Sequence, residues 1–548
     1  MSRMDSERVY PAIVASPGLV LGPLYVDAVR SVQTAARSSP AEERARLEAA
    51  AVTARQQLEA LAGGQDADAV EVLEFQIELL GDPELIAPAG AAIAEGAAAA
   101  EAWTAAIGGL IAEYDSEEDD YFRARAADLR DLKDRVLRAL ADEGSAAADA
   151  AAPDSIGIYV AEELAPSRFL EIDWTRFRGA ALTGGSTAGH VAILARARGV
   201  PMLIGLEAPL SALGSGTAAV LDAEQGRLVV APEAGHLARY QARAAEREIE
   251  IERERALLPN PALTAGGERV QLLVNIDDPA VIDALDPAHC DGIGLTRTEL
   301  QFYGLAERHG ALPDEDMQVQ LYRRILTWAS GRPVTIRTLD AGGDKPLDGL
   351  TLKGETNPFL GVRGLRLSLA HPEVFLLQLR ALARAAADCE SPLKVMLPMV
   401  TAPWEMAEAR RLLEEALAAL RVSGVPAARP ALGMMVEVPA AALGIGRFDA
   451  DFFSIGSNDL IQYVTATNRE EKALGRLYDP LDPGVLELIR RVAAHGRDSG
   501  REVSLCGDMA SDPRCIPALL DAGLRVLSVA PAALGRTKAA IAAWGGKG

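Results

Sequence analysis

The feature that most constrains this chain is a series of short apolar runs in its C-terminal half. From residue 268 onward, helical patterns alternate with the runs VQLLVNI, GIGLTR, VTIRTLD, KVMLPMV, LGMMVEVP, FFSIGSND, VSLCGD and VLSVAP. Eight strands that alternate with helices from residue 268 to the end of the chain are typical of a (β/α)8 barrel. We therefore predict a TIM barrel over residues 260–548.

Such a barrel carries its active site at the C-terminal ends of the strands. Polar residues end or directly follow the apolar runs here: Asn275, Arg297, Arg337, Glu437, Asn458, Asp459 and Cys506. Each alone is explained by a turn. Together they predict a barrel mouth lined by cations, carboxylates and a thiol.

Four arginines belong to this region, because Arg363 in NPFLGVRG and Arg469 in TNRE lie near Arg297 and Arg337. Guanidinium groups bind phosphate and carboxylate through paired hydrogen bonds, so the set predicts a site for a small, dense anion. A single arginine would be explained more simply by an ion pair with a surface acid.

The carboxylates Glu437 and Asp459 are hard oxygen ligands of the kind that Mg²⁺ takes when substrate phosphate completes its shell. Either could instead be a buried ion-pair partner. Cys506, where an apolar strand runs into a Gly turn, can act as a general acid. A buried, inert thiol is the alternative for this residue.

The N-terminal half predicts an α/β domain with a helical insertion. Residues 9–26 read as strand, turn and strand, residues 41–143 are dominated by helix formers, and residues 155–231 return to short apolar runs. We assign residues 1–30 and 145–235 to the α/β domain and 31–144 to the insertion. The charged segment 236–259 is interpreted as a linker helix with a solvated face.

A second candidate centre is the segment TGGSTAGHVAILARARGVPMLIG, residues 183–205. His190 lies between its Gly-rich loop and a predicted helix. Neutral imidazole is a good nucleophile, and backbone N–H groups at a helix N-terminus would stabilise a phosphoryl anion. A capping or core histidine is the alternative.

Composition restricts the partners and the compartment. A formal net charge of −23 at pH 7 disfavours nucleic acid, whose backbone requires clustered Lys and Arg, and fits a basic protein partner better. No apolar run has the length of a bilayer span, and the N-terminus lacks an apolar signal core. The four cysteines form no metal-binding pair or disulfide framework, so we expect a cytoplasmic protein without membrane insertion.

Several motifs carry a resemblance to a known family: ASPG, RAADLRD, GLTRTEL, RTLDAGGDKPL, ETNPFLGVRG, MVEVPAA, DFFSIGSNDLIQY and LCGDMA. In these motifs and their order, the chain resembles Enzyme I of the phosphoenolpyruvate-dependent sugar phosphotransferase system, from about residue 9 to about residue 540. The resemblance implies a swivelling phosphohistidine domain with a helical insertion, followed by a phosphoenolpyruvate-binding TIM barrel.

The resemblance also implies the roles of individual residues. His190 would be phosphorylated, and Cys506 would protonate the methylene carbon so that pyruvate leaves. Glu437 and Asp459 would bind Mg²⁺. Phosphoenolpyruvate would be bound by Arg297, Arg337, Arg363, Arg469 and Asn458, with Lys345 near the same site. The helical insertion would dock a histidine-containing phosphocarrier protein, and the barrel would form a homodimer.

The loop before His190 departs from the family pattern. Family members usually have Gly-Gly, one residue and then Thr-Ser-His, whereas this chain has GGSTAGH. His190 thus follows Thr187 by three positions rather than two, and Ala188 and Gly189 replace the hydroxyl-bearing Ser. The segment after His190 keeps the pattern, so we assign the histidine and expect the change to affect rate and carrier preference.

Two alternatives have similar sequence features. A pyruvate phosphate dikinase or phosphoenolpyruvate synthase combines a swivelling histidine with a barrel, but it also needs a nucleotide-binding domain, and no stretch of this chain offers one. A regulator that senses phosphoenolpyruvate without turnover would not need Cys506 or the two carboxylates. A pyruvate-release assay separates a sensor from an enzyme.

Overall fold

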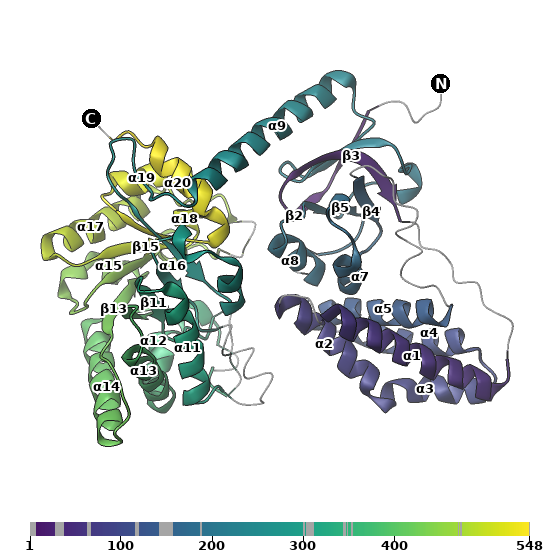
Figure 1. The fold of residues 1–548 in the computed structure, drawn as a ribbon, viewed down its shortest axis with the longest axis horizontal. Helices are drawn as coiled ribbons and strands as arrows, with labels where there is room; N and C mark the ends of the chain where they lie inside the picture. The colour runs from purple at the N-terminus through teal and green to yellow at the C-terminus, as the bar shows by residue number, and fades with distance from the viewer. Residues whose placement is uncertain are drawn as a thin grey trace. The chain divides into compact units, whose positions relative to one another are not determined.

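The computed structural model describes residues 7–27, 38–62, 67–115, 120–141, 157–186, 189–299, 302, 312–343, 347, 349–351, 355–469, 471 and 474–546. The chain divides into an N-terminal unit, Met1–Glu248, and a C-terminal unit, Ile249–Gly548 (Figure 1). Helix α9, Ala234–Leu257, runs across the boundary, and none of its residues is buried.

The N-terminal unit contains an eight-stranded mixed sheet in the order β1-β8-β7-β3-β4-β5-β6-β2. Its strands are β1 Arg8–Pro11, β2 Ile13–Ser16, β3 Leu19–Val26, β4 Gly157–Ala161, β5 Phe177–Leu182, β6 Met202–Ile204, β7 Ala218–Asp222 and β8 Arg227–Val230. Strand β3 pairs in parallel with β4 and antiparallel with β7. The N-terminal strands therefore complete a sheet whose other strands lie more than 130 residues later in the chain.

A bundle of helices lies between β3 and β4 in the chain (Figure 1). Its helices are α1 Pro40–Ala62, α2 Ala67–Gly81, α3 Pro83–Ala94, α4 Ala99–Asp115 and α5 Asp120–Leu140, and the sheet carries α7 Pro166–Glu171 and α8 His190–Ala197. On α1 the buried residues Leu47, Ala51, Ala54 and Leu58 recur at helical spacing, which turns one apolar stripe inward. One apolar core joins residues of the bundle, such as Trp103, to residues of the sheet, such as Tyr159.

The C-terminal unit is a closed barrel of parallel strands in the order β9-β10-β11-β12-β13-β14-β15-β16. The strands are β9 Gln271–Ile276, β10 Ile293–Thr296, β11 Val334–Arg337, β12 Leu393–Leu397, β13 Ala431–Val436, β14 Phe453–Gly456, β15 Val503–Cys506 and β16 Val526–Val529. They coincide with the eight predicted apolar runs. The predicted α/β fold class, with its C-terminal (β/α)8 barrel, is confirmed.

Helices surround this barrel: α11 Glu315–Ala329, α12 Leu365–Ala370, α13 Pro372–Ala387, α14 Pro403–Val422, α15 Pro439–Leu443, α16 Ser457–Thr465, α17 Pro483–Ser499, α18 Asp508–Ser511, α19 Ile516–Asp521 and α20 Leu534–Ala543. Helix α17 shows how the sequence sets their ends and faces. The Asp482 side chain caps its N-terminus by accepting from two backbone N–H groups, and Gly500 ends it in a left-handed conformation. Between these ends, the buried residues Val485, Leu488 and Val492 form the stripe that packs on the barrel.

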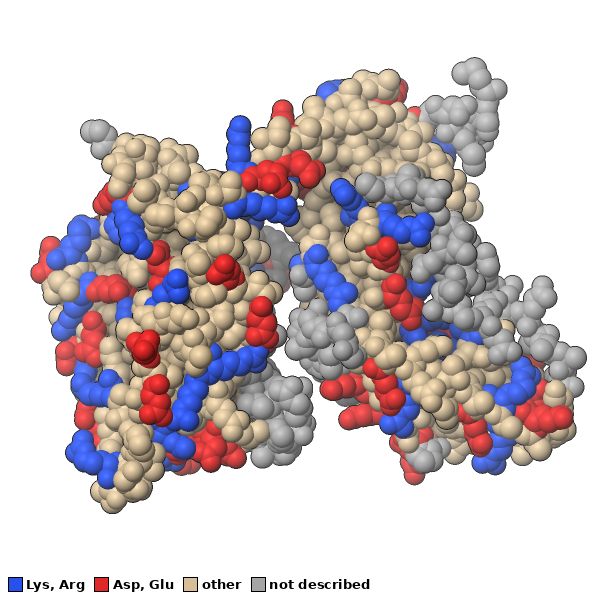
Figure 2. Space-filling model, viewed as in Figure 1, with Lys and Arg blue, Asp and Glu red and all other residues tan. Residues whose placement is uncertain are grey.

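Charged side chains of both signs are interspersed on the face of the molecule shown in Figure 2. On α14, for example, Arg411 contacts Glu408 at 2.8 Å and Glu415 at 2.9 Å, one turn away on either side. Such exposed pairs contribute little to stability. In the part of the chain that the structure describes, no helix combines the length and the apolar character needed to cross a membrane.

Candidate active site

A cavity of about 290 Å³ opens at the C-terminal ends of the barrel strands. It brings together eight of the barrel residues predicted for the mouth or the site: Arg297, Arg337, Arg363, Glu437, Asn458, Asp459, Arg469 and Cys506. Asn275 does not line the cavity, and Lys345 lies outside the described residues. These positions are far apart in the sequence, and most of them meet because they end or closely follow a strand of one closed parallel sheet. Arg363 and Arg469 instead come from the longer segments after β11 and β14.

Arg337 is held by two carboxylates. It is the last residue of β11, and its Nη2 donates to Oε1 of the fully buried Glu299 at 2.8 Å. Its Nη1 lies 3.0 Å from Oδ2 of Asp340. The same Glu299 oxygen accepts the backbone N–H of Asp340 at 3.0 Å, which ties the Glu299 carboxylate to the backbone of Asp340. The guanidinium group therefore has a fixed orientation before any substrate arrives.

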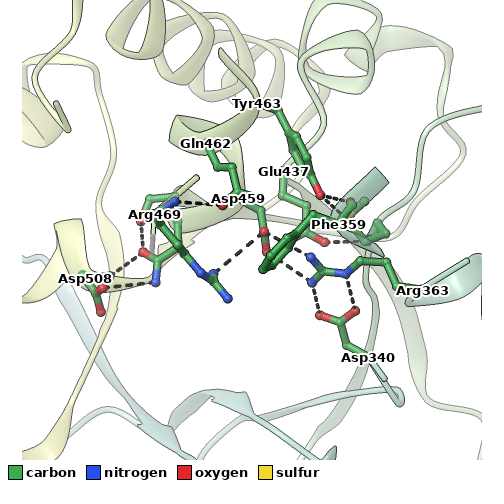
Figure 3. Close-up of polar contacts among 12 residues, drawn as sticks. Asp340, Phe359, Arg363, Glu437, Asp459, Gln462, Tyr463, Arg469 and Asp508 are labelled. Carbon is green, nitrogen blue, oxygen red and sulfur yellow. Dashed lines mark hydrogen bonds and ion pairs between the residues drawn. The ribbon is translucent and has the colours of Figure 1, made fainter. Parts of the chain in front are cut away.

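Arg363 shares one of these carboxylates and extends the network across the cavity (Figure 3). Its Nη2 donates to Oδ2 of Asp340 at 3.0 Å, and its Nη1 to Oδ1 of Asp459 at 3.3 Å. The Phe359 ring lies 5.9 Å from the guanidinium carbons of both Arg363 and Arg469. Arg469 also lies 3.8 Å from Asp459. Asp459 thus faces two arginines from different segments.

Glu437 follows β13 and is almost fully buried. Burial, together with the negative charges of Asp459 and Asp340, raises the pKa of this carboxyl to about 8, against the opposing effect of Arg337 and Arg363. Its Oε1 accepts the backbone N–H of Met399 at 2.5 Å. Met399 has a φ of 58°, an uncommon conformation for a residue with a side chain, so backbone strain is stored beside the cavity.

The donor set fits a magnesium ion that substrate oxygens would help to bind. A Cβ atom at Gly456 would lie 2.8 Å from Oε2 of Glu437, so the glycine keeps the space beside that oxygen open. Among the described residues, no cluster of three or more His, Cys, Asp or Glu side chains is placed to hold a metal ion. One or two carboxylates are what Mg²⁺ takes from a protein when substrate phosphate supplies further oxygens.

Cys506 is the last residue of β15 and is 2% exposed. Its thiol lies 3.6 Å from the Ser454 hydroxyl and 3.6 Å from the carbonyl oxygen of Ile455. Burial raises the pKa of the Cys506 thiol, so it keeps its proton at neutral pH. A protonated thiol that lines a cavity with four arginines is a candidate proton donor.

Three polar residues at the mouth are held by less buried contacts. Asn458 donates to Asp508 at 3.2 Å and accepts the backbone N–H of Asp508 at 3.0 Å. Arg297 donates to the half-exposed Asp277 at 3.1 Å. Asn275 instead accepts a hydrogen bond from the Ser528 hydroxyl at 2.6 Å, and it is not among the residues that line the cavity.

Sequence reasoning missed Asp340 and Glu299, which orient the arginines. Both lie within motifs that were recognised, Glu299 in GLTRTEL and Asp340 in RTLDAGGDKPL. The sequence signal that could have found them is their position. Glu299 lies three residues after the end of β10, and Asp340 lies three residues after the end of β11.

His190 belongs to the N-terminal unit and is the first residue of α8, as the predicted helix requires. Gly189 precedes it as the N-cap and offers no side-chain hydrogen bond to the first turn. The side chain of His190 is 23% exposed, and its Nδ1 lies 3.2 Å from Oδ1 of Asp128 on α5. Thr187 and Ala188, where the loop departs from the expected pattern, lie outside the described residues.

Three family models match the chain: PEP-utilising enzyme, N-terminal, over residues 11–125; PEP-utilising enzyme, mobile domain, over 154–226; and PEP-utilising enzyme, PEP-binding domain, over 251–544. A phosphoenolpyruvate-protein phosphotransferase of Geobacillus stearothermophilus is 35% identical, with 96% of this chain and 92% of the relative covered. One of Cupriavidus necator is 36% identical, with coverages of 90% and 86%. An Escherichia coli K12 protein named phosphoenolpyruvate-dependent phosphotransferase system is 34% identical, with coverages of 96% and 71%.

Proposed function

The chain belongs to the phosphoenolpyruvate-protein phosphotransferase family, and from this premise we propose which of its residues carry out the transfer. Phosphoenolpyruvate binds in the barrel cavity, His190 accepts the phosphoryl group, and a histidine-containing phosphocarrier protein receives it. The observation that carries this proposal is one cavity that collects four arginines, the three buried carboxyl groups of Asp340, Glu437 and Asp459, and a buried thiol.

The arginines match the two anionic ends of the substrate. Guanidinium groups bind phosphate and carboxylate in a forked geometry, and Arg337 and Arg363 are already oriented by buried acids. Arg297 and Arg469, which lie nearer the cavity opening, have more exposed side chains and can adjust to the substrate. Asn458 offers an amide to the phosphate, and Lys345 is proposed for the same region.

Glu437 and Asp459 are the proposed ligands of Mg²⁺. When bound there, the ion supplies charge neutralisation to the phosphoryl group during its transfer. Asp459 pairs with Arg363 and Arg469, and Glu437 lines the same cavity, so an ion held by these carboxylates would lie close to the arginines proposed for the substrate phosphate.

Cys506 is proposed to complete the reaction on the pyruvate side. Transfer of the phosphoryl group leaves the enolate of pyruvate, whose methylene carbon requires a proton. The buried thiol keeps its proton at neutral pH and lines the same cavity, as a general acid must. Pyruvate then leaves as the keto acid.

The helical insertion 31–144 is proposed as the docking site of the carrier. The protein is proposed to act in the cytoplasm. It is also proposed to form a homodimer through its barrel. These three points rest on the resemblance of the sequence motifs. Sedimentation of the purified chain tests the dimer, and a variant of the insertion that no longer accepts the phosphorylated carrier tests the docking site.

A labelling experiment tests the central proposal. The chain is incubated with radiolabelled phosphoenolpyruvate and Mg²⁺, and the labelled peptide is mapped. We expect an acid-labile, base-stable phosphoramidate on His190, with one pyruvate released per label. His190→Ala should bind phosphoenolpyruvate normally and remain unlabelled. Label on any of the other five histidines would overturn the assignment.

A further inference from the structure

Helix α5 presents a row of buried polar residues to α7 and α8. Asp128, Asp131 and Arg135 are 0%, 1% and 3% exposed, and their spacing places them on one face of the helix. Asp131 accepts the Ser167 hydroxyl at 2.7 Å and the Ser167 backbone N–H at 3.0 Å. Arg135 donates to Ser167 at 2.8 Å and contacts Glu171. Asp131 and Arg135 therefore join the helical bundle to α7.

Asp128 has a different partner on the same face. Its Oδ1 lies 3.2 Å from Nδ1 of His190, at the start of α8. The backbone carbonyl of Asp128 accepts a hydrogen bond from Gln76 at 3.3 Å, and the Gln76 amide also bonds Asp131 at 3.0 Å. The carboxylate is thus buried on a supported helix and directed at one particular ring nitrogen.

This contact decides where the ring carries its proton. An ionised carboxylate can only accept hydrogen bonds, so Nδ1 of a neutral His190 ring is the donor and Nε2 keeps its lone pair. We infer that Asp128 is a positioning residue for phosphoryl transfer, which fixes the Nδ1–H tautomer of His190 and presents Nε2 as the nucleophile. This inference rests on the proposed function, in which His190 is the phosphoacceptor.

The chemistry of the step is balanced without a further reactant. The Nε2 lone pair forms the N–P bond as the P–O bond to enolpyruvate breaks, and the released electron pair becomes the enolate that Cys506 protonates. The ring gains a positive charge while Nδ1 keeps its proton. The Asp128 carboxylate stabilises this charge, as a buried acid does behind a histidine that becomes cationic during catalysis. The charge is neutralised again when the carrier takes the phosphoryl group.

The tautomer can be measured without any turnover. In full-length protein labelled with ¹⁵N-histidine, the His190 signals are assigned by their loss in His190→Gln. Near neutral pH, we expect Nδ1 to have the ¹⁵N chemical shift of a protonated ring nitrogen and Nε2 to have that of an unprotonated one. An Nε2–H tautomer in the wild-type protein would overturn the inference, and this measurement needs no variant of Asp128 to fold.

The variant Asp128→Asn tests the consequence for transfer. An amide can donate to Nδ1 as well as accept from it, so both tautomers of His190 should be populated. The ¹⁵N chemical shifts of Nδ1 and Nε2 should then move toward averaged values. Single-turnover phosphorylation by phosphoenolpyruvate and Mg²⁺ should slow by about 100-fold. The KM for phosphoenolpyruvate should stay the same, because the substrate binds in the barrel. Asp128→Glu should restore part of the rate.

Asp131→Asn is the matched control, since it removes the next carboxylate on the same buried face. It should lower the melting temperature but leave the His190 tautomer unchanged. Wild-type shifts and rate in Asp128→Asn would refute the role of Asp128. If the wild-type chain carried its label on another histidine, the proposed function would fail instead, and the tautomer measurement would still report on Asp128.

Discussion

Nη1 of Arg363 lies 3.3 Å from Oδ1 of Asp459, so a proposed substrate-binding group and a proposed metal ligand are ion-paired across the cavity. A cation at Asp459 would compete for this carboxylate and release the guanidinium group for the substrate. Occupation of the metal site and the affinity for phosphoenolpyruvate are therefore expected to be linked.

Replacing Asp459 or Glu437 by Ala should reduce metal-dependent phosphorylation of His190 by at least about 100-fold, since the transferring charge loses its principal counter-charge. The measurement is the initial rate of phosphohistidine formation as a function of Mg²⁺ concentration. Asp508→Ala removes another carboxylate from the same cavity and should keep its response to Mg²⁺. If both variants kept the wild-type rate, and if chelation of Mg²⁺ also left that rate unchanged, the result would argue against the metal site.

Asp340→Asn should raise the KM for phosphoenolpyruvate by about 10-fold or more, because one buried carboxylate orients both Arg337 and Arg363. Steady-state kinetics with varied phosphoenolpyruvate measure the change. Asp277→Asn breaks the more exposed pair with Arg297 and should change the KM by less than about threefold. Equal effects of the two variants would show that burial of the ion pair has no influence on binding.

Gly364→Ala should weaken phosphoenolpyruvate binding through crowding. Gly364 has a φ of +57°, and a Cβ atom there would lie 2.9 Å from Cβ of Met399 and 3.0 Å from Oδ1 of Asp340. Gly424→Ala is the control: its φ is +66°, and no atom lies within 4 Å of an added Cβ. Gly424→Ala should lose about 1 kcal/mol of stability through strain alone, and Gly364→Ala should lose more because the added Cβ also crowds Met399 and Asp340. Only Gly364→Ala should lose affinity for phosphoenolpyruvate. Calorimetric titration with phosphoenolpyruvate distinguishes them.

Cys506→Ala should bind phosphoenolpyruvate normally and release pyruvate at least about 100-fold more slowly, since only the proton donor is lost. The pH dependence follows from the raised thiol pKa. The protonated, active form persists through neutral pH, and the rate assigned to this group should fall only above the ordinary thiol value of about 9. A pyruvate-release rate that falls already between pH 7 and 8 in the wild-type, with no such fall in Cys506→Ala, would contradict this assignment.

The barrel and its mouth could be predicted from the sequence because both depend on local patterns. Each strand is a short apolar run, and the closed sheet places the residue after each run at one rim, so Arg337, Glu437 and Cys506 were found together. Asp340 also lies close to a strand end, but an acid three residues after a strand is usually a turn residue, so its position alone did not assign it to the site. Its role depends on contacts in the folded chain, because Arg337 pairs with it and Arg363 returns to it from 23 residues later.

The surroundings of His190 illustrate the same limit. The motif RAADLRD was recognised, yet nothing in its pattern shows that Asp128 faces a histidine 62 residues away on another element. The left-handed backbone of Met399 is likewise imposed by tertiary contacts, since methionine has no preference for it. Sequence patterns identify which residues reach a site, whereas the pairing of charges within it depends on the assembled fold.

The buried apolar clusters of the described chain are confined to one unit or the other, and none combines residues from both. We therefore expect each unit to have its own cooperative unfolding transition. A ligand of the barrel at 100 times its Kd adds about 2.7 kcal/mol to the stability of that transition alone. A destabilising substitution in the core around Trp103 would likewise leave the barrel folded and able to bind phosphoenolpyruvate. Loss of folding in one unit and loss of substrate binding in the other are therefore separable defects.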